Sequence, residues 1–123
     1  MIQLKELDDT VSIRDQLQES SPEPVVLVNV FHVPPASTDA FVKAWEDDAR
    51  YFKEQPGFIS AQLHRGILGS GTFLNYAIWQ TVGAFRNAFA NPVFQSKLAA
   101  YPAGTTGSPH IFRKMAVTDI CVA

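Results

Sequence analysis

The sequence predicts an α+β fold in which helices cover one face of an antiparallel sheet. Three observations lead to this expectation. The apolar run Val25–Val33 is rich in β-branched residues, as core strands are. Two further apolar runs, Phe58–Leu68 and Thr72–Thr81, flank Gly69-Ser70-Gly71, which is a strong hairpin signal. Apolar residues recur at helical spacing both before and after this hairpin.

The composition indicates one globular domain with a moderate core, because 46% of the 123 residues are hydrophobic and 18% are charged. A net charge of −2 without a Lys/Arg cluster argues against nucleic-acid or membrane partners. No run is long enough to span a bilayer, and the first residues lack an apolar signal core, so we expect a cytoplasmic protein. The single Cys121 excludes an internal disulfide, and we expect a structural or tolerated thiol.

Residues 1–23 are interpreted as an arm appended to a domain formed by residues 24–123. Ser12 and Asp15 fit a capping box that opens a short helix through Gln18. Residues 19–24 are a loop by composition. The surface of a partner subunit is one candidate place for this arm to pack.

The first core strand and the long helix follow. Val25–Val33 is apolar on both faces, so both faces should be covered, and Pro34-Pro35 ends it. The helix begins at Ser37 or Thr38 and ends at Gln55-Pro56-Gly57. Four of its residues form a stripe that should pack on the sheet: Phe41, Trp45, Ala49 and Phe52. Three consecutive acidic residues point in different directions, so we expect a solvated face and not a metal site: Glu46, Asp47 and Asp48.

After the hairpin, Thr81 caps a short helix and Asn91-Pro92 opens a second. Residues 103–109 are expected to be a loop, and His110–Val122 alternates as a last strand. The order β-α-β-β-α-β is the ferredoxin-like plan. Helices cover only one side of such a sheet, so the second apolar face of Val25–Val33 needs another cover. The sheet of a second copy is the simplest one, and we expect a homodimer closed into a β-barrel.

One stretch carries a family resemblance. The run Asn75-Tyr76-Ala77-Ile78-Trp79-Gln80, followed by Ala84-Phe85 and Asn91-Pro92-Val93-Phe94, resembles the second half of the antibiotic biosynthesis monooxygenase family. The resemblance implies a dimeric α+β barrel with a ligand pocket between sheet and helices. It also implies oxygenation of small aromatic or quinol-like polyketides without a dedicated cofactor. In that chemistry the substrate anion supplies the electron to O2, while the protein removes a proton and stabilises the anion.

The resemblance and the strand pattern together give the candidate site. Asn75 and Trp79 match the Asn-x-x-x-Trp of this branch and are candidate catalytic residues. If Gly69-Ser70-Gly71 is a three-residue loop, Leu68 pairs with Thr72 and places Arg65 opposite Asn75 as a third. A loop of two or four residues would put His64 on that face instead. The candidate substrate-binding residues are Asn29, Phe31, His64, Phe73, Phe85 and Phe89.

Three departures keep other functions open. The tyrosine of this branch is replaced by Phe85 and its arginine is missing near Ala99, so His64 or His32 would have to handle the proton. A non-catalytic, dimeric small-molecule-binding module is therefore the alternative, and packing alone would also explain Trp79. Haem degradation is a third possibility, since Asn29 and Trp79 match two of its positions, but its axial histidine is Phe89. No histidines show metal-ligand spacing, and the use of a borrowed haem or flavin stays open.

Overall fold

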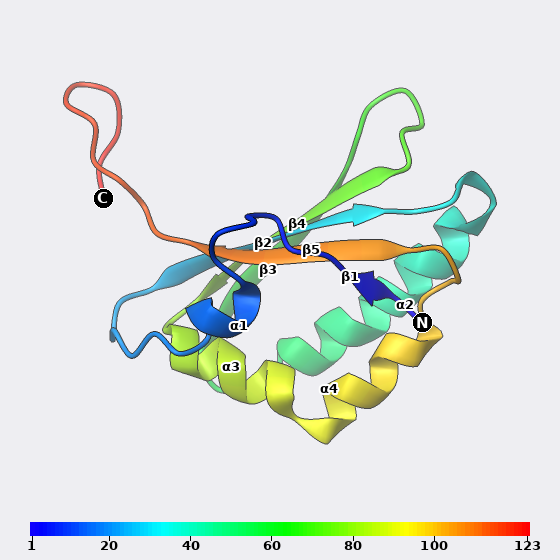
Figure 1. Ribbon diagram of the computed structural model, residues 1–123, viewed down its shortest axis with the longest axis horizontal. Helices are drawn as coiled ribbons and strands as arrows, with labels where there is room; N and C mark the ends of the chain where they lie inside the picture. The colour runs from blue at the N-terminus through cyan, green and yellow to red at the C-terminus, as the bar shows by residue number, and fades with distance from the viewer.

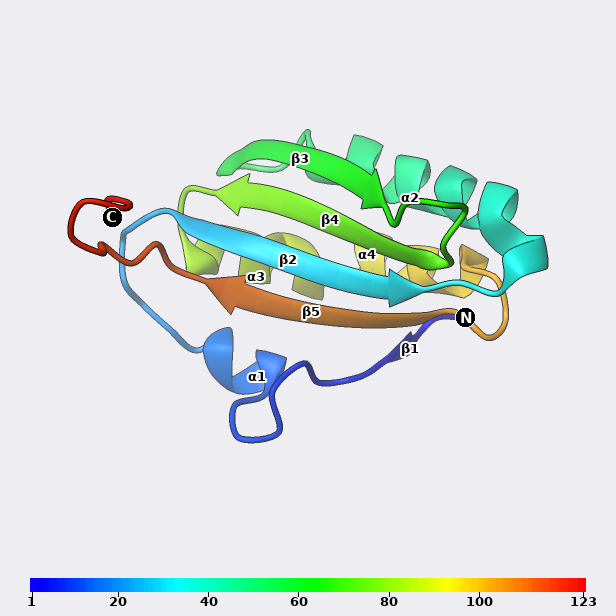
Figure 2. The ribbon, with the colours of Figure 1, turned by 90° about the horizontal axis from the view of Figure 1, so that it is seen from above.

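The computed structural model describes residues 1–123 and contains one five-stranded sheet with the strand order β1-β5-β2-β4-β3 (Figures 1 and 2). The strands are β1 (Gln3–Leu4), β2 (Val25–His32), β3 (Phe58–Arg65), β4 (Thr72–Trp79) and β5 (Thr106–Phe112). The helices are α1 (Ile13–Gln16), α2 (Thr38–Phe52), α3 (Val82–Ala90) and α4 (Pro92–Lys97), with short 3-10 turns at η1 (Pro35–Ser37) and η2 (Leu98–Ala100).

The predicted ferredoxin-like fold is confirmed. Strands β5, β2, β4 and β3 are antiparallel neighbours, so the four predicted strands lie in the order fourth, first, third, second. Helices α2, α3 and α4 all lie on one face of this sheet (Figure 1). Thr81 caps α3 through the amide of Ala84, and Asn91 caps α4 through the amide of Val93. These local signals fix where the helices after the hairpin begin.

The helix-covered face carries the core, which is divided into two apolar clusters. One cluster consists of Ile2, Phe31, Val33, Phe41, Ala44, Phe73 and Tyr101. The other consists of Val25, Leu27, Ala77, Trp79, Val82, Phe85 and Ala88. On β2 the residue between the two clusters is Asn29, and on β4 it is Asn75. A polar break therefore crosses the sheet in the middle of its buried face.

The N-terminal arm packs on its own domain. Strand β1 pairs in parallel with β5, and Ile2 is buried in the first core cluster. Helix α1 lies beside the same edge (Figure 2), where the Gln16 amide exchanges hydrogen bonds of 2.8 and 3.0 Å with the backbone of Ile111. These contacts satisfy backbone groups that an edge strand would otherwise leave open. The side-chain cap of Ser12 on the Asp15 amide, at 3.0 Å, is as predicted, although α1 ends at Gln16.

The expected boundaries of the last strand were wrong. Strand β5 begins at Thr106, within the predicted loop, and ends at Phe112. A Cβ at Gly107 would lie 2.9 Å from Ile2 Cδ1, so any other residue there would displace the end of that side chain. Pro109 is tolerated because it lies between Gly107 and Ile111, whose backbone groups bond to β1 and to Gln16, so its missing N–H faces the outer edge.

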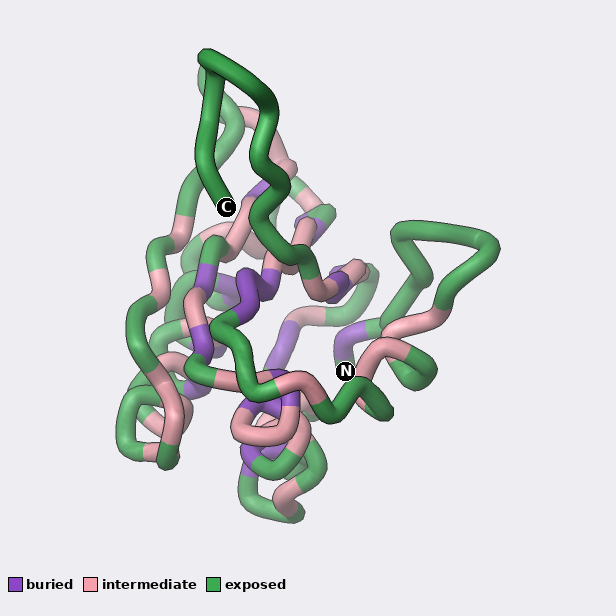
Figure 3. The backbone as a smooth tube through the Cα atoms, turned by 90° about the vertical axis from the view of Figure 1, so that its left-hand side faces the viewer, coloured by how far each residue is buried: buried purple, intermediate pink, exposed green.

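Residues 113–123 leave the sheet and form an exposed turn (Figure 3). Its only strand-like feature is an isolated bridge between Val117 and Cys121. The Cys121 thiol is exposed and lies outside any strand, contrary to the predicted pattern. No helix in the structure has the length and apolar character needed to cross a membrane.

Candidate functional site

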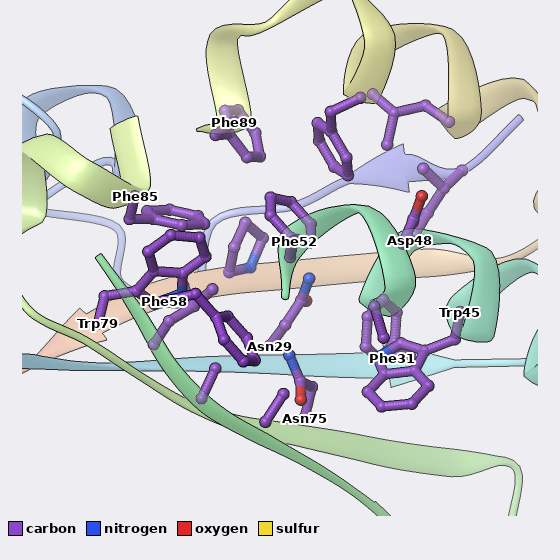
Figure 4. Close-up of a pocket in the computed structure, with 18 of the residues that line it drawn as sticks. Asn29, Phe31, Trp45, Asp48, Phe52, Phe58, Asn75, Trp79, Phe85 and Phe89 are labelled. Atoms are coloured by element: carbon purple, nitrogen blue, oxygen red, sulfur yellow. The ribbon is translucent and has the colours of Figure 1, made fainter. Parts of the chain in front are cut away.

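A pocket with a cavity volume of about 60 Å³ lies between the sheet and helices α2–α4 and opens to the surface (Figure 4). Most of the residues that line it are apolar, and several are aromatic. An apolar, aromatic lining with a few polar groups is typical of sites that bind small organic molecules. The lining also contains a small number of polar side chains, which are the candidates for orienting a ligand: Asn29, Asp48, Asn75 and Tyr101.

Asn29 and Asn75 form a cross-strand pair on the floor of the pocket. They are directly opposed in the β2–β4 register, so their side chains share the helix-covered face. Both amide oxygens are buried and have no hydrogen-bond partner within the protein. Burying each such oxygen without a partner lowers the free energy of unfolding by about 1–3 kcal/mol, a cost that an apolar residue at the same position would not have. Because an amide can turn about its Cβ–Cγ bond, the pair can offer a ligand either acceptors or donors.

Aromatic rings form one wall of the pocket, around Trp79, which is only 1% exposed. Phe52 and Phe58 meet the indole edge to face, with ring centroids 5.8 and 5.4 Å away. Phe85 lies 5.5 Å from the indole, and Phe89 lies 5.5 Å from Phe85. Trp79 is therefore both a core residue and a lining residue, and the wall suits a flat ligand.

The sequence analysis missed Asp48, which was expected on a solvated face. Glu46 and Asp47 are exposed, but Asp48 is only 4% exposed and lines the pocket. It lies seven residues after Phe41 and four before Phe52, so the apolar stripe of α2 includes its position. This spacing was the available signal.

The Asp48 carboxyl group is held by Tyr101. The Tyr101 hydroxyl donates a short hydrogen bond to Oδ2, while Oδ1 is buried and has no partner. Burial raises the pKa of Asp48 to about 6, against the opposing effects of the Tyr101 hydrogen bond and the nearby Lys97 charge. Burial and the neighbouring carboxylate raise the pKa of Tyr101, so its phenol stays protonated. The pair is the pocket's only titratable group, since no other lining residue ionises.

Arg65 lies outside the pocket, which corrects the predicted constellation. The hairpin connection spans Gly66–Gly71, with Leu68 and Gly69 at positive φ, and Arg65 pairs with Phe73. Leu63, and not Arg65, is opposite Asn75. The predicted face was right, but the register differs by two residues. The Arg65 guanidinium is exposed and donates to the carbonyls of the loop, at 2.9 and 3.2 Å.

The remaining predicted residues divide between the pocket and its surroundings. Phe31, Phe85 and Phe89 line the pocket together with Asn29, Asn75 and Trp79. Phe73 is buried in the first core cluster and does not line it. His64 and His32 are exposed on strand positions that face away from the helices, so neither can serve the pocket as a proton acceptor.

The lining residues do not fit haem. Phe89 stands where the resemblance would place an axial histidine, the lining contains no histidine, cysteine or methionine, and the hydroxyl of its one tyrosine is bound to Asp48. No group of three or more His, Cys, Asp or Glu side chains is arranged to hold a metal ion. What the pocket offers is an aromatic wall, two amides and one carboxyl–phenol pair.

Known proteins share both the sequence pattern and the fold. The model of the antibiotic biosynthesis monooxygenase family matches residues 24–98. Deoxynogalonate monooxygenase of Streptomyces nogalater is 32% identical over 88 residues, which make up 72% of this chain and 74% of that protein. Tetracenomycin-F1 monooxygenase of Streptomyces glaucescens is 38% identical over 79 residues, 61% of this chain and 67% of that protein.

Solved structures agree. The crystal structure of SnoaB, a cofactor-independent oxygenase from Streptomyces nogalater, superposes with a TM-score of 0.67 at 30% identity. The match covers 79% of this chain and 98% of that one. Taken with the fold and the Asn75–Trp79 motif on β4, these matches show that the chain belongs to the antibiotic biosynthesis monooxygenase family.

Proposed function

We propose that this protein is a cofactor-independent monooxygenase of a small, fused-ring aromatic substrate, of the phenol or anthrone type made by polyketide pathways. The observation that carries the proposal is the cross-strand Asn29–Asn75 pair, whose buried, unpartnered amide oxygens lie in a pocket walled by aromatic rings. An inert core has no use for two such amides. The activities of the relatives, monooxygenation of deoxynogalonate and tetracenomycin F1 and oxygenation without a cofactor, support the same proposal.

The chemistry requires little of the protein. Removal of a proton gives the substrate a delocalised anion, which can pass an electron to O2 and then bond to it. Amide N–H groups of Asn29 and Asn75, turned towards the ligand, would stabilise the oxygen on which this negative charge accumulates. The indole N–H of Trp79 is a third donor in the same pocket, and the surrounding phenyl rings would hold the substrate flat.

The active form is proposed to be a homodimer in which two sheets pack face to face. The sheet face away from the helices carries the half-buried side chains of Val28, Val30, Leu74 and Ile78, together with Tyr76, which is 42% exposed. A second copy of this apolar face is its simplest cover. Analytical ultracentrifugation should find a dimer for the native protein and a monomer for Tyr76→Glu; a native monomer would refute the assembly.

Oxygen uptake with a panel of anthrones and dihydroxynaphthalenes tests the reaction. We expect saturable uptake by metal-free protein and a product that carries one added oxygen atom. Asn75→Ala should abolish most of this uptake. Asn87→Ala is the matched control, because Asn87 is exposed on α3 and should leave uptake unchanged. Binding of the panel without any uptake would instead favour the non-catalytic binding module. The apolar side chains of Phe85 and Phe89 in the pocket lining support that alternative.

A further inference from the structure

The proposed reaction needs a proton acceptor, and the sequence motifs do not supply one. Neutral phenols and anthrones give electrons to O2 only after they lose a proton. Amides and indoles do not accept protons at ordinary pH, and His32 and His64 face away from the helix-covered side. Within the pocket, only Asp48 and Tyr101 can change protonation state. The acceptor must therefore be sought in this pair.

The geometry of Asp48 is that of an acceptor with one free oxygen. Its Oδ2 is occupied by the Tyr101 hydroxyl, whereas its buried Oδ1 has no partner in the protein. Figure 4 shows Asp48 near Trp45 and Phe31, with Asn29 and Asn75 between it and Trp79. The same arrangement follows from the core, since Tyr101 belongs to the first cluster and Trp79 to the second. A flat ligand on the asparagine pair would thus have the aromatic wall at one end and a carboxylate at the other.

The surroundings make this carboxylate a stronger base than an ordinary one. Burial disfavours its charge, and the exposed neighbour Asp47 on α2 acts in the same direction. The Tyr101 hydroxyl and Lys97 on α4 oppose this effect. The balance leaves the pKa of Asp48 at about 6. The group is therefore mostly ionised at neutral pH, and it binds a proton more tightly than an ordinary carboxylate does.

We propose that Asp48 is the general base of this pocket and that Tyr101 positions it, an inference that rests on the oxygenase function proposed above. Oδ1 takes a proton from a substrate O–H or activated C–H, and the electron pair of that bond stays on the substrate as an enolate or phenolate. The anion transfers an electron to O2 and combines with it, and one proton converts the product to a hydroperoxide. Loss of the remaining C–H proton and cleavage of the O–O bond then give a carbonyl and water. Overall, one CH2 and one O2 become one C=O and one H2O.

Asp48 also has a purely structural explanation, as the acceptor for the buried Tyr101 hydroxyl. Asp48→Asn separates the two explanations, because the amide oxygen still accepts this hydrogen bond but cannot take a proton. A base is worth roughly 10²–10⁴-fold in rate, so kcat should fall by at least ~100-fold while KM changes little. The lost activity should return as the pH approaches the pKa of the substrate, since the substrate then ionises without help.

The experiment measures kcat and KM for oxygen uptake from pH 5 to 10, with a weakly acidic anthrone and a more acidic dihydroxynaphthalene. Glu54→Gln is the control, an exposed carboxylate just after α2 that has no ion pair and should keep native kinetics. A larger loss for Asp48→Asn with the weaker acid, recovered at high pH, is the expected result. Native kcat in Asp48→Asn at neutral pH would overturn the base while leaving the oxygenase intact. No uptake by the native protein with any substrate would overturn both.

Tyr101→Phe gives a second test that does not depend on the folding of the first variant. Removal of the phenol takes away a hydrogen bond that stabilises the carboxylate, so the acidic limb of kcat/KM should move to higher pH. A merely structural Tyr101 would change protein stability without moving this limb. An unshifted limb would therefore overturn the assignment.

Discussion

Replacement of Asp48 by asparagine should stabilise the protein at neutral pH. The pKa of this carboxyl group is raised from 3.8 to about 6 in the folded state, so folding at pH 7 has to accommodate an unfavourable buried charge. A shift of this size corresponds to about 3 kcal/mol. The substitution removes the charge and keeps an acceptor for the Tyr101 hydroxyl. We expect Asp48→Asn to raise the free energy of unfolding by about 1–3 kcal/mol, or Tm by roughly 4–12 °C.

The sign of the pH dependence follows from the direction of the shift. Because the folded protein holds this proton more tightly than the unfolded chain, the contribution of Asp48 is fully present below pH 3.8 and is lost as the pH rises through about 6. The stability difference between variant and native protein should therefore be small at pH 4 and largest at pH 7 and above.

Urea unfolding at pH 4, 5, 6, 7 and 8 measures this difference, with protein concentration held constant because assembly contributes to stability. Glu54→Gln is the control, since its carboxylate is exposed and should show no comparable trend. A difference that is the same at pH 4 and pH 7 would refute the reasoning, because Asp48 would then not titrate in this window. A variant that is less stable at pH 7 would do so as well.

Three further outcomes are expected from the structure. Asn75→Leu should stabilise the fold by about 1–2 kcal/mol in thermal unfolding while abolishing oxygen uptake, because it removes a buried amide oxygen that has no partner; destabilisation would mean that the amide is satisfied in the folded protein. Gly57→Ala should cost roughly 2 kcal/mol or more, because φ is +88° and the added Cβ would lie 2.4 Å from the Cβ of Ala84; a neutral result would show that α3 can shift. Gln16→Ala should weaken docking of the arm and speed hydrogen exchange at the Ile111 amide, with little change at β4 amides; unchanged exchange at Ile111 would mean that the side chain of Gln16 does not hold the arm.

The family relationship and the physical argument identify different parts of the site. The Asn75–Trp79 motif was visible in the sequence, and the structure adds Asn29 as the direct cross-strand neighbour of Asn75. Neither Asp48 nor Tyr101 belongs to a recognisable sequence motif. Their contact joins residues 53 positions apart in the chain. Contacts of this kind depend on how a helix packs, which a strand motif does not specify.

The sequence by itself determined the order of the four antiparallel strands and the main helices, and which face of most of them is buried. Alternation along Val25–Val33, the stripe of Phe41, Trp45 and Phe52, and the caps at Thr81 and Asn91 all depend on local backbone geometry. The two-residue period of a strand also placed Arg65 on the same face as Asn75, even though their pairing was predicted incorrectly. These features need no knowledge of distant residues, and they were sufficient for the fold.

Tertiary structure alone decided the register, the strand edges and the site. A period of two cannot distinguish pairings that differ by two residues, so the connection Gly66–Gly71 had to set the partner of Arg65. The sequence around Gly107 and Pro109 resembles a loop, and it becomes a strand because β2 pairs with it on one side and the N-terminal arm on the other. The acidic Asp48 resembles a surface residue until Tyr101 and the pocket surround it. In the last two cases the deciding interaction is long-range, and its energy is absent from the local sequence that it overrides.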